Sequence, residues 1–171
     1  MSEPLWAPWR MEYILAKKEG GCIFCAYALA DETVFAEEHV LVATDQAYVV
    51  LNKYPFAAGH LLVVPRRHAG ELETLSDAEH DALFRLTREA ATRLRRAVSA
   101  QGLNIGLNLG KSAGAGIGEH LHVHIVPRWD GDTNFMPVLA DVRVMPQHRE
   151  ATFRHLYPFF VDIPGRRAKT P

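Results

Sequence analysis

The chain has 171 residues, of which 48% are hydrophobic and 23% are charged, and its formal net charge is -1. This length and composition predict one globular domain with a substantial hydrophobic core. The low net charge excludes bulk electrostatic attraction to nucleic acid or to an anionic membrane, so neither is expected as a partner. The sequence contains no apolar run near the ~20 residues of a membrane-spanning helix, and it begins without the apolar stretch of a secretory signal. These absences predict a cytoplasmic location.

Composition along the chain predicts three regions. Residues 1–20 are rich in aromatic side chains without clear periodicity, which predicts an N-terminal extension. Residues 21–157 are expected to form the domain, because no linker or internal repeat divides them. Residues 158–171, which proline and glycine interrupt, are expected to form a C-terminal tail that is loose at its end.

The first half of the domain reads mainly as strands. Residues 34–35 and 39–43 predict a short hairpin around Glu37 and Glu38. Enrichment in β-branched and aromatic residues predicts a strand at 48–52. After a turn over the next residues, a further strand is expected at 60–65, where a proline ends it.

One long helix is expected at residues 77–100. Ser76 and Glu79 have the spacing of a capping box, which places the start of the helix. Apolar residues recur at helical spacing and mark the buried face, namely Leu83, Leu86, Ala90, Leu94 and Val98. Arginines occupy most of the remaining surface, and we interpret them as a solvated face rather than a site for polyanions: Arg85, Arg88, Arg93, Arg95 and Arg96.

The remaining elements complete the predicted fold class. A strand is expected at 103–108, a glycine-rich segment follows at 110–118, and a shorter helix is expected near 147–156. Short turns between strands, with only one long helix, favour an antiparallel sheet in an α+β domain.

Three histidines alternate with apolar residues in the sequence HLHVHIVP, which spans 120–127. In a strand, alternate side chains share a face, so His120, His122 and His124 are expected on one face and the residues between them in the core. Imidazole changes charge near neutral pH and can act as nucleophile, acid, base or metal ligand. The pattern therefore predicts a functional site rather than an inert, exposed face.

The glycine-rich segment directly before these histidines favours phosphate as the ligand. Backbone N–H groups of such a segment can converge on an anion, and Lys111 and Ser112 could add a positive charge and a hydroxyl. A plain flexible turn is the alternative. A neutral imidazole can attack phosphorus when a carbonyl holds its other ring nitrogen, while neighbouring imidazoles hold phosphate oxygens. The central residue, His122, is the candidate nucleophile.

The pattern H-x-H-x-H followed by two apolar residues resembles the signature of the histidine-triad (HIT) superfamily of nucleotidyl hydrolases and transferases. The resemblance extends over about residues 22–135 through three further stretches: N-x-x-P from Asn52, GHLLVVP from Gly59 and LNLG from Leu107. The stretches LWAPWRM from Leu5 and PRWDGDTNF from Pro127 are most similar to the bacterial and archaeal branch that includes diadenosine tetraphosphate phosphorylases.

The resemblance implies a HIT-like fold, with an antiparallel sheet of about five strands, one long helix and a C-terminal helix, and a homodimer. It implies that His122 is the nucleophile, that His124 and His60 contact the α-phosphate or orient the nucleophile, and that Asn52 contacts the ribose. Binding of phosphates or of the leaving group is implied for Asn108, Gly110, Lys111, Ser112 and Gly116. Candidates for a base pocket, which we interpret rather as core, are Phe35, Val50 and Leu51. The group that protonates the leaving group stays open.

Cys22 and Cys25 form a C-x-x-C pair, which supplies half of a tetrahedral zinc site from one short turn. Two buried free thiols, or a thioredoxin-type redox pair, are the alternatives, although no βαβ pattern supports the second. The family resemblance implies that His68 and His120 complete the site. Zinc with four protein ligands would be structural. The other histidines are expected to be ordinary surface residues: His39, His80, His148 and His155.

The leading functional hypothesis is therefore an enzyme that cleaves a dinucleoside polyphosphate, with diadenosine tetraphosphate as the expected substrate, through a nucleotidyl-His122 intermediate. Water or inorganic phosphate could be the acceptor, and magnesium could accompany the substrate's phosphates. Three alternatives remain open: a nucleoside phosphoramidase, a zinc-stabilised nucleotide-binding module without turnover, and a metallohydrolase in which the three histidines hold catalytic zinc.

Overall fold

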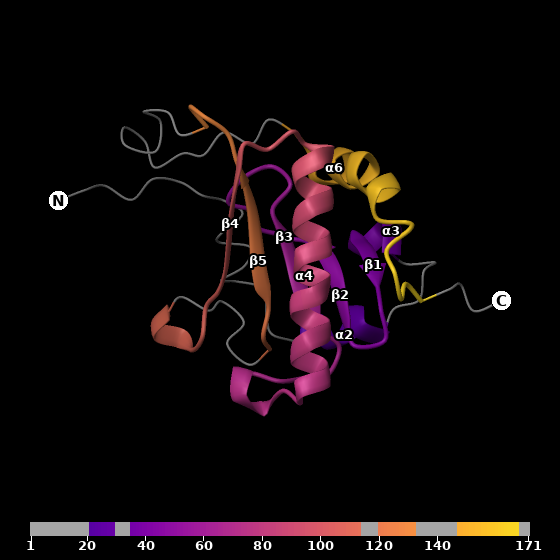
Figure 1. Cartoon of the computed structure of the whole chain (residues 1–171), viewed down its shortest axis with the longest axis vertical. Helices are drawn as coiled ribbons and strands as arrows, with labels where there is room; N and C mark the ends of the chain where they lie inside the picture. The colour runs from indigo at the N-terminus through magenta and orange to yellow at the C-terminus, as the bar shows by residue number, and fades with distance from the viewer. Residues whose placement is uncertain (1–20, 30–34, 114–119, 133–146, 168–171) are drawn as a thin grey trace.

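A computed structural model describes residues 21–29, 35–113, 120–132 and 147–167. These residues form one five-stranded antiparallel sheet in the order β1-β2-β3-β5-β4 (Figure 1). The α+β class, with about five strands and one long helix, is confirmed. The strands are β1 (Val40–Ala43), β2 (Ala47–Leu51), β3 (Leu61–Pro65), β4 (Gly102–Leu107) and β5 (Val123–Arg128).

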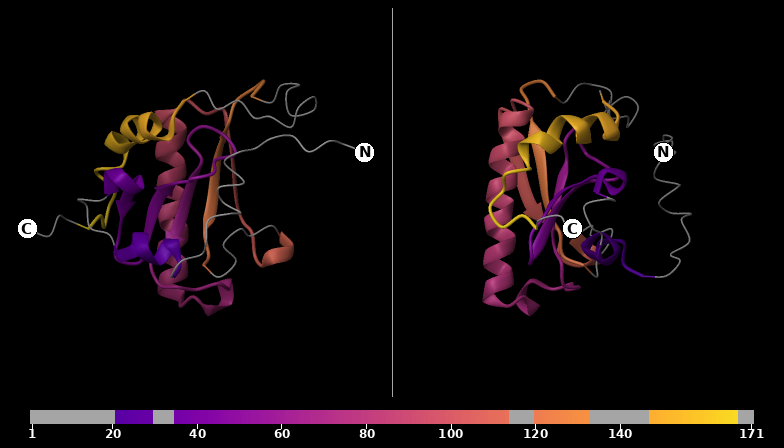
Figure 2. Two further views of the ribbon diagram at one scale, coloured as in Figure 1. Left: turned by 180° about the vertical axis from the view of Figure 1, so that it is seen from behind. Right: turned by 90° about the vertical axis from the view of Figure 1, so that its right-hand side faces the viewer.

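Helices cover both faces of this sheet. The long helix α4 (Asp77–Ala97) lies along one face, and α2 and α3 lie on the other, as the edge-on view in Figure 2 shows. No helix among the described residues is long and apolar enough to cross a membrane. The remaining helices are α2 (Ile23–Leu29), α3 (Phe35–Glu38) and α6 (Arg149–Leu156), with short 3-10 turns η1 (Leu72–Thr74), η2 (Lys111–Ala113) and η3 (Tyr157–Phe159).

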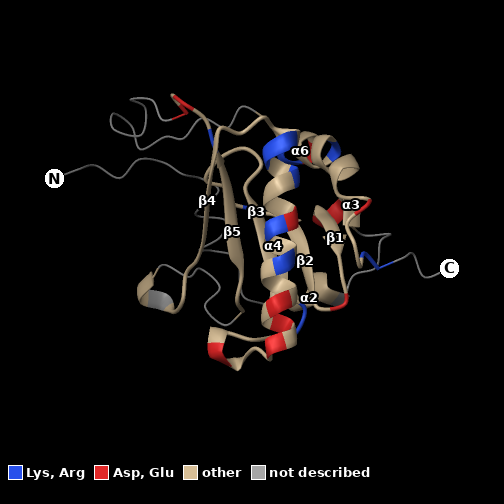
Figure 3. Ribbon diagram, in the orientation of Figure 1, with Lys and Arg blue, Asp and Glu red and all other residues tan. Residues whose placement is uncertain are grey.

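Helix α4 begins and packs as its sequence predicts. Ser76 Oγ accepts the backbone N–H of Glu79 at 3.3 Å, and Glu79 Oε2 accepts that of Ser76 at 2.9 Å, so the capping box is present. The helix ends at Ala97, three residues before the predicted end. Acidic side chains lie near its start and arginines near its end (Figure 3), which suits the helix dipole. The predicted core positions Leu83, Leu86, Ala90 and Leu94 are buried, and Val98 is partly buried.

The strand alternation divides the core into two layers. On β3, Leu61 and Val63 pack beneath α4, whereas Leu62 and Val64 belong to a second cluster with Phe24 of α2. Because His60 directly precedes β3 and shares the parity of Leu62, it lies on the face covered by α2. His60, and His124 which pairs with Leu62, therefore lie on the sheet face opposite the long helix.

The hairpin predicted around Glu37 and Glu38 is wrong. The described part of this region forms the single-turn helix α3, whose Phe35 is buried, and His39 adopts a left-handed conformation (φ 60°) before β1. The pairing partner of β1 is β2 rather than the residues before it. Burial of the Phe35 ring in the second core cluster accounts for the difference.

The described part of the predicted C-terminal tail packs on the core of the domain. Phe160 and Ile163 belong to the core beneath α4. Arg93 of α4 donates to the carbonyl of Phe159 at 2.8 Å and forms an ion pair with Asp162. One arginine of the supposedly solvated face therefore anchors this segment. The predicted N-terminal extension, residues 1–20, and residues 168–171 lie outside the described residues.

Candidate active site and metal centre

Three histidine rings meet where β3 and β5 lie side by side. The centroids of the His60 and His124 rings are 5.1 Å apart, and those of His122 and His124 are 4.9 Å apart. Only His124 lies within β5, because the strand begins at Val123, so the expectation that the whole HLHVHIVP run is a strand is wrong. The expected shared face still holds, since the ring of Phe24 contacts both His120 and His122.

His122 is held in one tautomer by the backbone. Its Nδ1–H donates to the carbonyl oxygen of His120 at 2.9 Å, so the neutral ring carries its lone pair on Nε2. Only 8% of the residue is exposed, and burial lowers the pKa of His122 below its usual value. A neutral imidazole with a fixed tautomer and a free Nε2 can act as a nucleophile.

A chain of hydrogen bonds assigns the proton on His124. The backbone N–H of Phe56 donates to Nδ1 of His60 at 3.0 Å, so the proton of the neutral His60 ring must lie on Nε2. That Nε2–H donates to Nδ1 of His124 at 2.9 Å, which leaves the proton of His124 on its own Nε2. The Nε2 atom of His124 is buried and has no hydrogen-bond partner among the described residues. It is a donor available to a substrate oxygen.

Burial keeps these rings uncharged. Desolvation, with a smaller effect of the neighbouring histidines, lowers the pKa of His60 to about 3 and that of His124 to about 4. Both rings are therefore neutral near pH 7, and the tautomers above apply. The arrangement combines an uncharged nucleophile, His122, with an uncharged N–H donor, His124, and suits attack on an anionic phosphate.

Asn52 lies beside His60, and the protein already contacts both ends of its amide. Its Oδ1 accepts the backbone N–H of Tyr54 at 2.9 Å, which orients the amide. Its Nδ2 lies 3.2 Å from Nδ1 and 3.5 Å from Nε2 of His60, so it faces the ring rather than one nitrogen. The ribose contact implied for Asn52 remains a prediction.

A cavity of about 190 Å³ opens beside Asn52 and His60, between the β2–β3 turn and the start of α6. Of the three base-pocket candidates, Leu51 lines this cavity, whereas Phe35 and Val50 belong to the second core cluster, as expected of core residues. The other lining residues are Pro55, Ala58, Gly59, Gln147, His148, Arg149 and Thr152.

The predicted phosphate-binding residues are described only in part. Leu107 pairs with Val123, so Asn108, which is half-buried, follows β4 close to where His122 precedes β5. Gly110 has a positive φ of 76°, and Ser112 is exposed. The side chain of Lys111 and all of Gly116 lie outside the described part of the chain, so phosphate binding by these residues remains a prediction.

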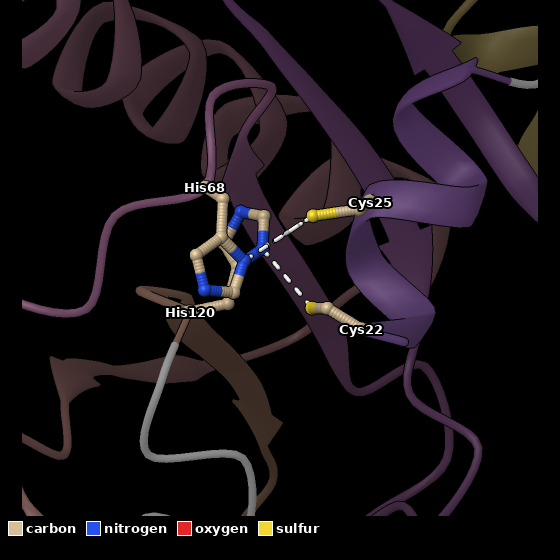
Figure 4. Close-up of side chains that lie close together, drawn as sticks. All are labelled: Cys22, Cys25, His68 and His120. Atoms are coloured by element: carbon tan, nitrogen blue, oxygen red, sulfur yellow. Dashed lines mark hydrogen bonds between the residues drawn. The ribbon is translucent and has the colours of Figure 1, made fainter. Parts of the chain in front are cut away.

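Four potential metal ligands converge beside the histidine site (Figure 4). The distance from Sγ of Cys22 to Nδ1 of His120 is 3.3 Å, and that from Sγ of Cys25 to Nδ1 of His68 is 3.2 Å. All four donor atoms lie within 4.8 Å of one another. Tetrahedral zinc with its usual bond lengths places sulfur and nitrogen ligands about 3.5 Å apart. The four residues therefore fit a tetrahedral metal ion.

His120 is oriented for metal binding. Its Nε2–H donates to the carbonyl oxygen of Pro65 at 2.9 Å, which leaves the lone pair of Nδ1 directed at the cysteines. Burial and the neighbouring Cys22 raise the pKa of the Cys25 thiol in the absence of a cation. A bound divalent cation would reverse this effect, because it stabilises thiolates.

The sequence analysis missed two aromatic residues at the site, and it misjudged one histidine. Phe24 packs against the site histidines, and its position between the two cysteines could have indicated this. The backbone and ring of Phe56 contact His60, and no sequence signal beyond the adjacent N-x-x-P motif points to it. His39 is not an ordinary surface residue, since it is half-buried, accepts a hydrogen bond from Arg149 and packs edge-on against Phe153. His80, His148 and His155 are exposed, as expected.

An antiparallel α+β sheet that brings alternating histidines together around a buried, neutral imidazole defines a histidine-triad protein. The chain belongs to the HIT domain family, whose model matches residues 34–131. It is 39% identical to an AP-4-A phosphorylase of Mycobacterium tuberculosis over 158 residues, which are 89% of this chain and 81% of the relative.

Solved structures agree with this assignment. A Zn-bound histidine triad family protein from Mycobacterium smegmatis matches with a TM-score of 0.65 and 28% identity, over 82% of this chain and 93% of that one. A hypothetical histidine triad nucleotide-binding protein from Sulfolobus tokodaii matches with a TM-score of 0.63 and 25% identity, over 81% and 91% of the two chains.

Proposed function

We propose that this protein cleaves dinucleoside polyphosphates, with diadenosine tetraphosphate as its substrate, through a nucleotidyl-His122 intermediate. The observation that carries the proposal is the hydrogen bond from Nδ1–H of His122 to the carbonyl of His120, which leaves a neutral Nε2 as nucleophile. Membership of the HIT family and the similarity to an AP-4-A phosphorylase support the substrate class.

The reaction has two displacements at one phosphorus. Nε2 of His122 attacks the α-phosphorus, a P–N bond forms, and the P–O bond to the leaving nucleoside polyphosphate breaks. The Nε2–H of His124 donates to an oxygen of the reacting phosphate and stabilises the charge that develops there. Inorganic phosphate or water then attacks phosphorus, and the P–N bond breaks. Phosphate gives a nucleoside diphosphate, and water gives a monophosphate.

Product analysis on diadenosine tetraphosphate, with and without inorganic phosphate, tests this proposal. The first displacement releases ATP, so we expect ATP to accumulate over many turnovers only where an acceptor that the enzyme uses is present to break the P–N bond. ADP that forms only with phosphate identifies a phosphorylase, and AMP in both reactions identifies a hydrolase. Absence of any product would contradict the proposal, and turnover of an adenosine phosphoramidate under the same conditions would then identify a phosphoramidase.

The geometry disfavours the metallohydrolase alternative. Catalytic zinc on three histidines requires their nitrogens to converge on one point. Here Nδ1 of His122 donates to a carbonyl, Nδ1 of His124 accepts from His60, and Nδ1 of His120 faces the cysteines. The Nδ1 atoms of the three rings therefore face three different partners and do not converge on one metal ion.

We also propose that Cys22, Cys25, His68 and His120 hold a structural zinc ion. The tetrahedral spacing of their donor atoms and the Zn-bound relative from Mycobacterium smegmatis support this assignment. Zinc would crosslink α2 to the segment after β3 and to His120, two residues before His122. Adenine preference, magnesium on the substrate's phosphates and a cytoplasmic location remain predictions.

We propose that a homodimer forms through β4, one of the two edge strands of the sheet among the described residues. Ile105 on this strand is 48% exposed and Leu109 just beyond it is 41% exposed, so an apolar edge is available for pairing. We expect Ile105→Lys to convert a dimer into a monomer by light scattering, whereas Val161→Lys, at an exposed site away from this edge, leaves the dimer intact. A wild-type monomer, or a dimer that survives Ile105→Lys, would contradict the proposal.

A further inference from the structure

Phe56 is a large apolar residue that remains half exposed beside the histidine site. It is 50% exposed and lies in the turn between β2 and β3. Its ring centroid is 4.7 Å from that of His60, with an interplanar angle of 38°. The same ring lies nearly parallel to that of His124, with the centroids 5.9 Å apart at 18°. The Phe56 ring therefore covers two histidine rings at once while half of the residue stays exposed.

The backbone of the same residue contacts the same pair. The N–H of Phe56 donates to Nδ1 of His60, and this bond assigns the protons of both rings, as described above. The amide and the ring of Phe56 thus act on one hydrogen-bonded unit, the His60–His124 pair. The consequence of both contacts is an uncharged His124 whose Nε2–H is free for a substrate oxygen.

We propose that Phe56 is a positioning residue for the nucleotidyl transfer: its amide selects the tautomer of the His60–His124 pair, and its ring keeps water from that pair. This inference rests on the proposed function, because it assigns His124 the role of N–H donor. Phe56 itself forms no bond to phosphorus and exchanges no proton with the substrate.

The surroundings of His124 explain why the cover matters. The titratable groups that face it among the described residues are His60 on the β3 side and His122 just before β5, and β4 places Gly106 opposite it. Within the described part of the chain, no carboxylate contacts the His124 ring to favour its charged form. Burial is the main reason that the pKa of His124 lies near 4. Opening the site to water would restore hydration of the imidazolium and raise this pKa toward 6.5.

Histidine ring ¹⁵N NMR on the full chain, combined with steady-state kinetics on diadenosine tetraphosphate, tests the proposal. In the wild type we expect His124 to be neutral, with the proton on Nε2, at all pH values above about 5. In Phe56→Ala we expect the pKa of His124 to rise toward 6.5. At pH 5.5 about a tenth of such rings would be neutral, so kcat there should fall about tenfold relative to the wild type, with a smaller change near pH 7 and in KM. Phe56→Leu, which restores an apolar cover, should lie close to the wild type in both measurements.

Phe84→Ala is the matched control. Phe84 is also an exposed phenylalanine in ring contact with a histidine, His80, at 4.7 Å, but on the outer face of α4. This variant should change neither the His124 resonances nor kcat.

Two results would overturn the inference. The first concerns His124 and is either an unchanged titration in Phe56→Ala, which keeps the amide and removes the ring, or a proton on Nδ1 in the neutral wild type. The second is a change in Phe56→Ala that is confined to KM for diadenosine tetraphosphate, with kcat unchanged. If KM for adenosine tetraphosphate, which has one base, stays the same, the Phe56 ring binds the second base by stacking and does not position the histidines. The NMR readout needs no turnover. A wild type that fails to cleave the substrate but shows the expected titrations therefore contradicts the proposed function and leaves the covering role intact.

Discussion

His122→Asn will reduce kcat for diadenosine tetraphosphate by about ten-thousand-fold or more, because it removes the atom that forms the covalent intermediate. Asparagine retains an N–H that can donate to the carbonyl of His120, so the local backbone should remain as in the wild type. Its amide has no basic nitrogen to replace Nε2. The measurement is single-turnover and steady-state kinetics on the purified variant, with circular dichroism to establish that it is folded.

The matched control for this prediction is His80→Asn, which removes an exposed imidazole on α4 that contacts Asp81 and Phe84. It should retain wild-type turnover. A second readout comes from acid-free trapping of the wild type with substrate, followed by mass spectrometry, which should locate one nucleoside monophosphate on His122. Undiminished turnover in His122→Asn, or an adduct on another residue, would refute the assigned nucleophile.

Cys25→Ser will remove bound zinc, lower the melting temperature and reduce turnover together. Loss of one thiolate weakens a four-ligand site, and the free energy of structural zinc binding contributes to folding. A loss of several kcal/mol in a chain of this length corresponds to a decrease of about 10 °C or more. Turnover should fall although Cys25 contacts no catalytic histidine, because the metal ligand His120 also provides the carbonyl that orients His122. Elemental analysis and calorimetry are the measurements.

His148→Ala is the control for the metal site, since it removes an exposed histidine that contributes no ligand. It should retain one zinc per chain and the wild-type melting temperature. His122→Asn should also retain zinc, which separates a structural metal from a catalytic one. A Cys25→Ser variant with full zinc content, or wild-type protein that binds no zinc during refolding with the metal present, would contradict the assignment.

Local patterns predicted the elements whose stability depends on local contacts. The Ser76–Glu79 capping box and the spacing of the leucines located α4 to within three residues at its end. Enrichment in β-branched and aromatic residues located β2, and the strands predicted at 60–65 and 103–108 match β3 and β4, each bound to within one residue. The family resemblance supplied the metal ligands, and the structure brings all four together, although His68 and Cys22 are separated by more than forty positions in the sequence.

Contacts between residues far apart in the sequence determine the features that the sequence analysis did not predict. Phe35 packs in the second core cluster, and its segment forms a helical turn where a hairpin was expected. Phe160 and Ile163 complete the core under α4, so a segment that looks like a tail is part of the domain. The tautomer of His124 depends on a backbone N–H from a distant turn, and no single-residue property encodes such a contact.

His120 has two neighbours at once: its ring faces the cysteines, and its carbonyl oxygen accepts a hydrogen bond from Nδ1–H of His122. A compound that strips the metal would therefore act as an inhibitor without resembling any nucleotide. Kinetic constants measured after purification in strong chelators would describe a mixture of competent and incompetent molecules. Laboratories that compare such preparations should report metal stoichiometry beside every rate.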